Sequence, residues 1–141
     1  MKTKALHQPY RLLKLTFGVV PIVAGLDKFT NLLTNWEQYL NPLLARAVPP
    51  FAFLRVIGVV EIVAGLVVLS KFTRLGAYVV AAWLVGIALN LLSSGHFLDV
   101  AVRDLVMAVG ALTLAKLEGA GATRAPEKEG PAASFWREPA R

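Results

Sequence analysis

Four long apolar stretches constrain this chain more than any other feature of its sequence. They cover residues 12–33, 51–70, 75–93 and 98–117. At a rise of about 1.5 Å per residue, each stretch can cross a hydrocarbon core of about 30 Å. The third stretch contains no charged side chain. We therefore predict an all-α membrane protein built as a four-transmembrane-helix bundle.

The composition agrees with a lipid environment and excludes several kinds of site. Hydrophobic residues make up 56% of the 141 residues and the mean hydropathy is +0.58, which is more apolar surface than a soluble domain of this length can bury. The chain has no cysteine, which excludes disulfide scaffolds and cysteine-ligated zinc or iron–sulfur sites. Its two histidines, His7 and His96, fall on opposite sides of the predicted membrane. We therefore expect no metal and no covalently bound cofactor.

Basic side chains are distributed unevenly about the predicted spans. Eleven of the fifteen Lys and Arg residues flank the side that holds both termini, and four lie on the other side together with five acids. Because Lys and Arg accumulate in cytoplasmic segments, both termini are predicted to lie in the cytoplasm. The net charge of +6 is then explained by the membrane topology and by attraction to anionic lipid. We therefore expect no nucleic-acid partner.

The predicted spans divide the chain into three regions. Residues 1–10 form a cytoplasmic N-terminus, residues 11–117 the membrane domain, and residues 118–141 a cytoplasmic tail whose composition predicts disorder. Between the first two spans, residues 34–50 carry apolar side chains at spacings of three to five. This spacing predicts one short amphipathic helix lying at the outer membrane surface, with Trp36 and Tyr39 at the level of the headgroups.

A nine-residue segment occurs twice. Residues 18–26 (GVVPIVAGL) and 58–66 (GVVEIVAGL) are identical at eight of nine positions and belong to spans of opposite direction. In each copy two glycines seven residues apart share one helix face, and small residues let helix backbones approach closely in lipid. Two interpretations are open: general packing by small residues, or antiparallel contact between the two glycine faces, as in an inverted repeat.

Polar side chains within the spans concentrate in the predicted outer half. Ionisable residues at membrane depth are costly and usually face the interior of a bundle, where they are paired or hydrated. We assign no catalytic residue. We predict a buried polar cluster or ligand-binding site formed by Asp27, Lys28, Arg55, Glu61, Asn90, His96, Asp99, Arg103 and Asp104.

The arrangement within this set follows from helix geometry. Asp99 and Arg103 are one turn apart and can pair locally, whereas Asp104 is rotated by about 100° from Arg103. A guanidinium at this depth needs a partner, so we expect Arg103 to lie within reach of Glu61, the deepest acid, or of an acid in the first span.

Other side chains of the outer half have simpler expected roles. His96 can donate a hydrogen bond to a quinone carbonyl near Asn90, although a histidine in such a loop is more often simply solvated. Trp83 in the third span is expected to be a packing group or a lipid contact. Three interpretations of the polar set stay open: an ion-pair network that fixes helix register, a ligand pocket, and a proton or ion path.

Several segments resemble the DoxX family of bacterial membrane proteins. They are residues 24–29 (AGLDKF), 58–61 (GVVE), 64–66 (AGL), 71–74 (KFTR) and 98–104 (LDVAVRD), and the resemblance covers residues 11–117. It implies a four-helix bundle in a bacterial inner membrane. Some members of that family are described as the membrane subunit of a thiosulfate:quinone oxidoreductase, others as partners in oxidative-stress complexes, and many have no assigned activity.

The expected function follows from this resemblance and from the polar set. We expect an accessory subunit of a redox or quinone-linked membrane complex, without catalytic activity of its own, that holds a quinone or lipid in an outer-half pocket. The alternatives are a membrane subunit that takes part in quinone reduction, a small oligomeric transporter or channel subunit, and an assembly factor for membrane proteins. Its expected partners are the bilayer, other membrane or periplasmic subunits, or further copies of the chain.

Overall fold

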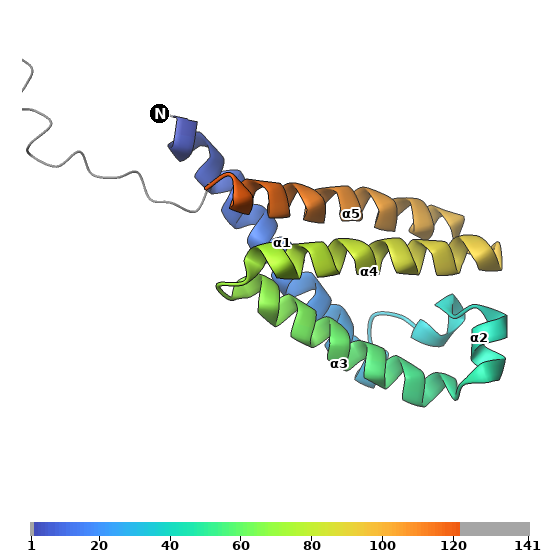
Figure 1. Ribbon diagram of the computed structural model, residues 1–141. Helices are drawn as coiled ribbons and strands as arrows, with labels where there is room; N and C mark the ends of the chain where they lie inside the picture. Colours follow the sequence, from blue (N-terminus) through green and yellow to red (C-terminus); the bar gives the residue numbers. More distant parts are fainter. Residues whose placement is uncertain (1, 122–141) are drawn as a thin grey trace, which may run out of the picture.

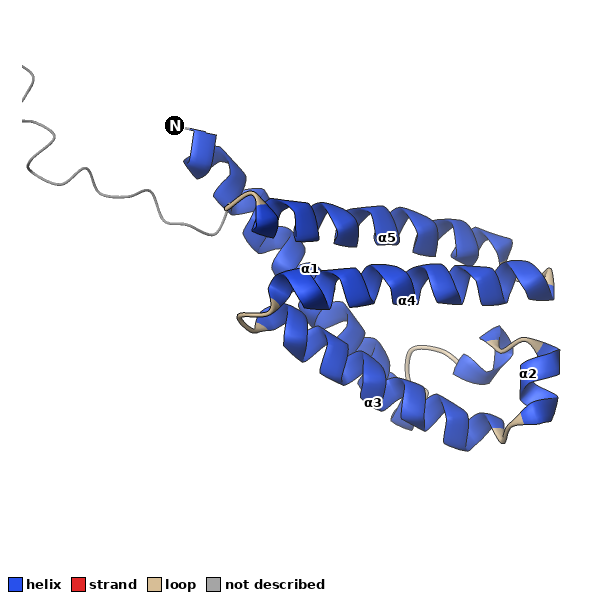
Figure 2. Cartoon of the chain, in the orientation of Figure 1, coloured by secondary structure: helices blue, strands red, loops and turns tan. Residues whose placement is uncertain are grey.

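The computed structural model describes residues 2–121, and in this range it is helical, without any strand (Figure 1; Figure 2). Its elements are α1 (Lys2–Thr30), the 3-10 helix η1 (Trp36–Tyr39), α2 (Pro42–Ala47), α3 (Pro50–Leu69), α4 (Thr73–Ser94) and α5 (Leu98–Gly119). Helices α3, α4 and α5 agree with their predicted apolar stretches to within two residues, whereas α1 begins ten residues before the predicted stretch 12–33 and ends three residues short of its end. The all-helical prediction is confirmed for these residues, and the predicted tail lies largely outside them.

Two of the long helices meet the requirements of a membrane span by length and composition alone. Within the described residues these are α3 and α4, with 20 and 22 residues and mean hydropathies of 2.4 and 2.0. Only 28% and 33% of their apolar segments are buried inside the molecule. Most of their apolar side chains therefore face outward, unlike those of a core helix in a soluble protein. Helices α1 and α5 are as long but carry more charged side chains.

The four long helices are arranged as two pairs. Helix α1 packs chiefly against α3, and α4 packs chiefly against α5. Figure 1 shows the start of α1, the α3–α4 turn and the end of α5 together at one end, which we call the basic end. Residues 31–49 and the α4–α5 turn lie at the opposite end, which we call the loop end.

Side chains from all four long helices meet in one apolar core. Its buried members are Tyr10, Phe17, Val68, Ala77, Val80, Ala81, Ala111, Leu114 and Ala115. The small residues of α4 and α5 allow these two helices to lie close together.

Helix α1 begins at Lys2, so its residues 2–10 continue the first apolar helix without a break at the predicted boundary.

The repeated glycines bring α1 and α3 into backbone contact. A Cβ added at Gly58 would lie 2.7 Å from the carbonyl oxygen of Gly25, and a Cβ at Gly25 would collide with the carbonyl oxygen of Gly58. A Cβ at Gly65 would likewise collide with the carbonyl oxygen of Gly18. The two copies of the repeat therefore face each other in antiparallel directions. The interpretation as an antiparallel contact between the two glycine faces is confirmed.

The connection between α1 and α3 differs from its prediction. Instead of one amphipathic helix, it holds two short helices, η1 and α2. The side chains of Asn35 and Asn41 accept hydrogen bonds from the backbone N–H groups of Glu37 and Leu43, at 3.1 and 2.9 Å, and so begin two separate helices. Pro42 has no N–H group to continue a helix that started earlier.

Candidate functional site

A group of buried polar side chains lies on the loop-end half of the molecule and draws on five elements. We call it the polar cluster; its members are Asp27, Lys28, Trp36, Glu61, Trp83 and Asp104. They come from α1, η1, α3, α4 and α5. All four acidic and basic members are at most 9% exposed. This is the one place in residues 2–121 where several buried ionisable side chains gather.

The centre of the polar cluster is an ion pair between α1 and α3. The ammonium nitrogen Nζ of Lys28 donates a hydrogen bond of 2.6 Å to Oε2 of Glu61. Both side chains are buried, with 5% and 8% exposed. Charges removed from water need close partners, and at this distance each largely neutralises the other. The pair therefore ties the middle of α3 to the end of α1.

Two tryptophans complete the surroundings of this ion pair. The indole N–H of Trp83 on α4 donates to Oε1 of Glu61 at 3.3 Å, which links the two helix pairs. The ring of Trp36 lies against Lys28, whose Nζ is 3.6 Å from the ring centroid, a cation–π contact. Each charged group of the pair thus has an aromatic neighbour as well as its counter-charge.

Asp27 has a different role from its neighbour Lys28. Its carboxylate accepts hydrogen bonds from the backbone N–H groups of Leu32 and Leu33 at 2.8 and 3.1 Å and from the Trp36 indole at 2.7 Å. These bonds hold the chain where it leaves α1, at Asn31 with its positive φ of 50°. Asp27 is therefore a cap that fixes the position of Trp36 over Lys28.

Asp104 is the unbalanced member of the polar cluster. It is 6% exposed and lies within electrostatic range of Arg103 and of Glu61. None of the hydrogen bonds within the described residues reaches its carboxylate. The guanidinium of Arg103 is bonded to Asp99, and Glu61 is paired with Lys28. The polar cluster thus holds three buried acids, Asp27, Glu61 and Asp104, and one buried cation, Lys28, with the exposed Arg103 beside Asp104. A buried carboxylate without a hydrogen-bond donor is costly, so this position favours a donor from outside the chain.

Arg103 lies elsewhere than expected. Its guanidinium donates a hydrogen bond of 2.9 Å to Asp99, one turn earlier on α5, and the two side chains are 69% and 72% exposed. The prediction that Arg103 reaches Glu61 or an acid of the first span is therefore wrong, and the local pairing is the one observed. Because adjacent helix residues are about 100° apart, Asp104 faces the interior and Arg103 faces outward.

The three remaining residues of the predicted set also lie outside the cluster. Arg55 is exposed and covers the ring of Phe51, with 4.0 Å from its Cζ to the ring centroid. Asn90 donates to the carbonyl oxygen of Tyr39 at 2.8 Å and so attaches η1 to α4. The exposed His96 bonds only within its own turn, its Nδ1 lying 2.9 Å from the carbonyl oxygen of Ser94.

Sequence reasoning missed the two tryptophans as polar members. The expectation that Trp83 serves only as a packing group or lipid contact overlooked its N–H group, which needs an acceptor when the ring is partly buried. The predicted depth in the membrane could have indicated this contact, because the predicted spans place Trp83 at about the same level as Glu61. The position of Trp36 depends on the turn after α1, for which the sequence has no comparable signal.

The fold and the polar cluster define a class: a helical membrane protein with outward apolar faces and a paired, buried polar centre. A match to a family model makes this class specific. The model for DoxX matches residues 11–92, more than half of the chain, and the chain therefore belongs to the DoxX family. The match extends from α1 into α4 and includes Lys28, Glu61 and Trp83. No curated protein and no solved structure matches the chain.

Proposed function

We propose that this DoxX-family protein spans a bacterial inner membrane four times, with both termini in the cytoplasm, as an accessory subunit of a redox or quinone-linked complex. The observation that carries the functional part is the side chain of Asp104, which is 6% exposed between Arg103 and Glu61 and accepts no hydrogen bond from the described residues. A quinol headgroup has hydroxyl groups that can donate hydrogen bonds to this carboxylate. Electron transfer itself would use the cofactor of a partner subunit.

The four-span topology is supported by the common placement of basic side chains. Arg11, Lys14, Lys71, Arg74 and Lys116 belong to the start of α1, the α3–α4 turn with the first turn of α4, and the end of α5. These segments share the basic end in Figure 1. In a chain that crosses the bilayer four times, both termini and the connection between the second and third spans lie on the same side of the membrane. The polar cluster then lies in the outer half of the membrane.

Reporter fusions test this topology. A fusion within residues 71–74 is expected to report the cytoplasm, and a fusion within residues 94–97 the periplasm, because Lys and Arg are retained on the cytoplasmic side. The measurement is the activity of a reporter that folds on one side only, compared with a second reporter of opposite preference. A periplasmic signal from the fusion within residues 71–74 would contradict the proposed orientation.

Quinol binding tests the role of Asp104. We expect the purified protein to bind a short-chain ubiquinol saturably, and Asp104→Asn to bind it about 10-fold to 100-fold more weakly, since a hydrogen bond to a charged group contributes about 1.5–3 kcal/mol. The matched control is Asp99→Asn, which removes an exposed acid from the same helix. Equal binding by Asp104→Asn and the unchanged protein would refute the proposed contact.

Co-purification tests the role as a subunit. Extraction of the tagged protein in mild detergent is expected to recover a flavin-, haem- or iron–sulfur-containing partner in a fixed ratio. Recovery of the chain only as a homo-oligomer would contradict the accessory role and favour the transporter interpretation.

A further inference from the structure

A shallow groove at the basic end lies apart from the polar cluster. It is lined by Lys71, Phe72, Arg74, Leu75 and Tyr78, from the α3–α4 turn and the first turns of α4. Two of these side chains are cationic, and the apolar parts of the others are exposed: Phe72 by 55%, Leu75 by 61% and Tyr78 by 38%. The groove therefore joins positive charge to accessible apolar surface.

The cations of the groove, Lys71 and Arg74, form no ion pair in the described part of the chain. The guanidinium of Arg74 lies over the end of α5, since a Cβ added at Gly119 would be 3.2 Å from its Cζ. The nearby Lys14 donates to the carbonyl oxygen of Ser70 at 3.1 Å, which adds a further cation to the turn.

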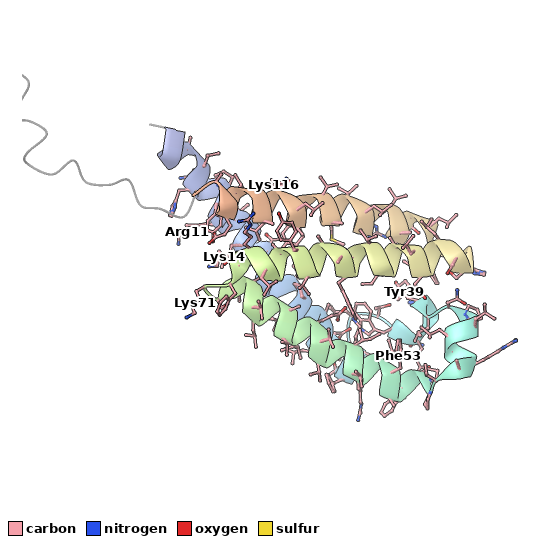
Figure 3. All side chains as sticks on the ribbon, viewed as in Figure 1. Arg11, Lys14, Tyr39, Phe53, Lys71 and Lys116 are labelled. Carbon is pink, nitrogen blue, oxygen red and sulfur yellow. The ribbon has the colours of Figure 1, made fainter. Side chains whose placement is uncertain are left out.

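The wider basic end increases this positive potential. Figure 3 shows Arg11, Lys14, Lys71 and Lys116 gathered there. Among residues 2–121 the acid at this end is Glu118, and one of its carboxylate oxygens is buried. An anion that enters the groove meets cations from more than one helix.

An apolar track continues from the groove along α4. Leu75, Val79, Ala82 and Gly86 are exposed, and their spacing places them on one face of the helix. A Cβ added at Gly86 would meet no atom within 4 Å, so the track is open at this position. Gly86 lies 11 residues beyond Leu75, about 16 Å along the helix axis, which an acyl chain can span.

We propose that this groove is a binding site for an anionic phospholipid. The phosphate lies between Lys71 and Arg74, at the level where these side chains leave the membrane, and an acyl chain lies along Leu75, Val79 and Gly86. Charge complementarity identifies the headgroup, and the apolar track identifies a lipid as the source of the phosphate in preference to a soluble phosphate compound.

The experiment uses the full chain in detergent and measures lipid binding by native mass spectrometry. Phosphatidylglycerol is expected to bind saturably, and phosphatidylcholine with the same acyl chains at least 10-fold more weakly. Lys71→Gln/Arg74→Gln is expected to weaken phosphatidylglycerol binding about 30-fold, which corresponds to about 1 kcal/mol for each cation. Glycerol phosphate is expected not to compete, because it lacks the acyl chains.

The matched control has the same charge change at the same end of the molecule. Arg11→Gln/Lys116→Gln removes two exposed cations outside the groove and is expected to change binding less than about 3-fold. Gly86→Phe fills the track at a position with open space and is expected to weaken the lipid by about 10-fold. Equal losses in the two double variants would show diffuse attraction to the basic end and overturn the proposal, as would competition by glycerol phosphate.

Discussion

Replacing Lys28 with methionine is expected to lower the free energy of unfolding by about 3–5 kcal/mol, because it leaves the buried carboxylate of Glu61 without its counter-charge. Glu61→Gln, which leaves the ammonium group unpaired, is expected to cost a similar amount. The measurement is equilibrium unfolding in mixed micelles, with helical circular dichroism as the signal. These are large effects for a membrane domain of this size.

The double variant separates a structural role of the pair from a role in ligand binding. Lys28→Met/Glu61→Gln combines the two single changes, removes both charges and is expected to recover part of the loss, which identifies the pair as the source of the effect. The control, Arg103→Gln, breaks an exposed pair and is expected to cost less than about 1 kcal/mol. Unchanged stability of Lys28→Met together with lost quinol binding would contradict the structural role.

The second large effect concerns the backbone contact between α1 and α3. Gly25→Ala and Gly58→Ala are each expected to destabilise the protein by about 3 kcal/mol, because each new Cβ meets a carbonyl oxygen of the other helix, which cannot turn aside as a side chain can. The same measurement of unfolding applies.

Gly86→Ala is the matched control for this contact, since its Cβ enters open space. It is expected to leave stability unchanged or to raise it by up to about 1 kcal/mol, in line with the higher helix propensity of alanine. A loss at Gly86 as large as that at Gly25 would show that the cost comes from the helix itself and not from the contact between helices.

The long helices could be predicted from the sequence, and the α1–α3 contact was one of two open interpretations, because both depend on local spacing. A run of about 20 apolar residues has the length of a span, and glycines seven apart share a helix face. The opposite directions of the two copies allow an antiparallel contact, and the structure shows that it forms. The length of an apolar run and the spacing of two glycines can both be seen within a short segment of the sequence.

The partner of Glu61 could not be predicted because it depends on contacts between distant segments. Arg103 and Asp104 are neighbours in sequence, and the rotation of α5 decides which of them is buried. Lys28 is held under Trp36 by the cap that Asp27 makes for the following turn. The break at Pro42 has a sequence signal, since proline cannot donate a backbone hydrogen bond, and the prediction of a single helix did not use it.

The arrangement in two helix pairs has a mechanical consequence. At the basic end, an apolar core of side chains from all four long helices holds the pairs together. Towards the loop end, α3 and α4 are linked by the hydrogen bond from Trp83 to Glu61. The segment between α1 and α3 is attached to α4 and α5 by hydrogen bonds to Asn90 and by Tyr39, which packs against a smaller apolar cluster. Each such bond contributes only about 1 kcal/mol net. We therefore expect the two helix pairs to move relative to each other about a hinge in the apolar core, among Phe17, Val80 and Leu114. Such a motion would change the spacing of the helices around the polar cluster.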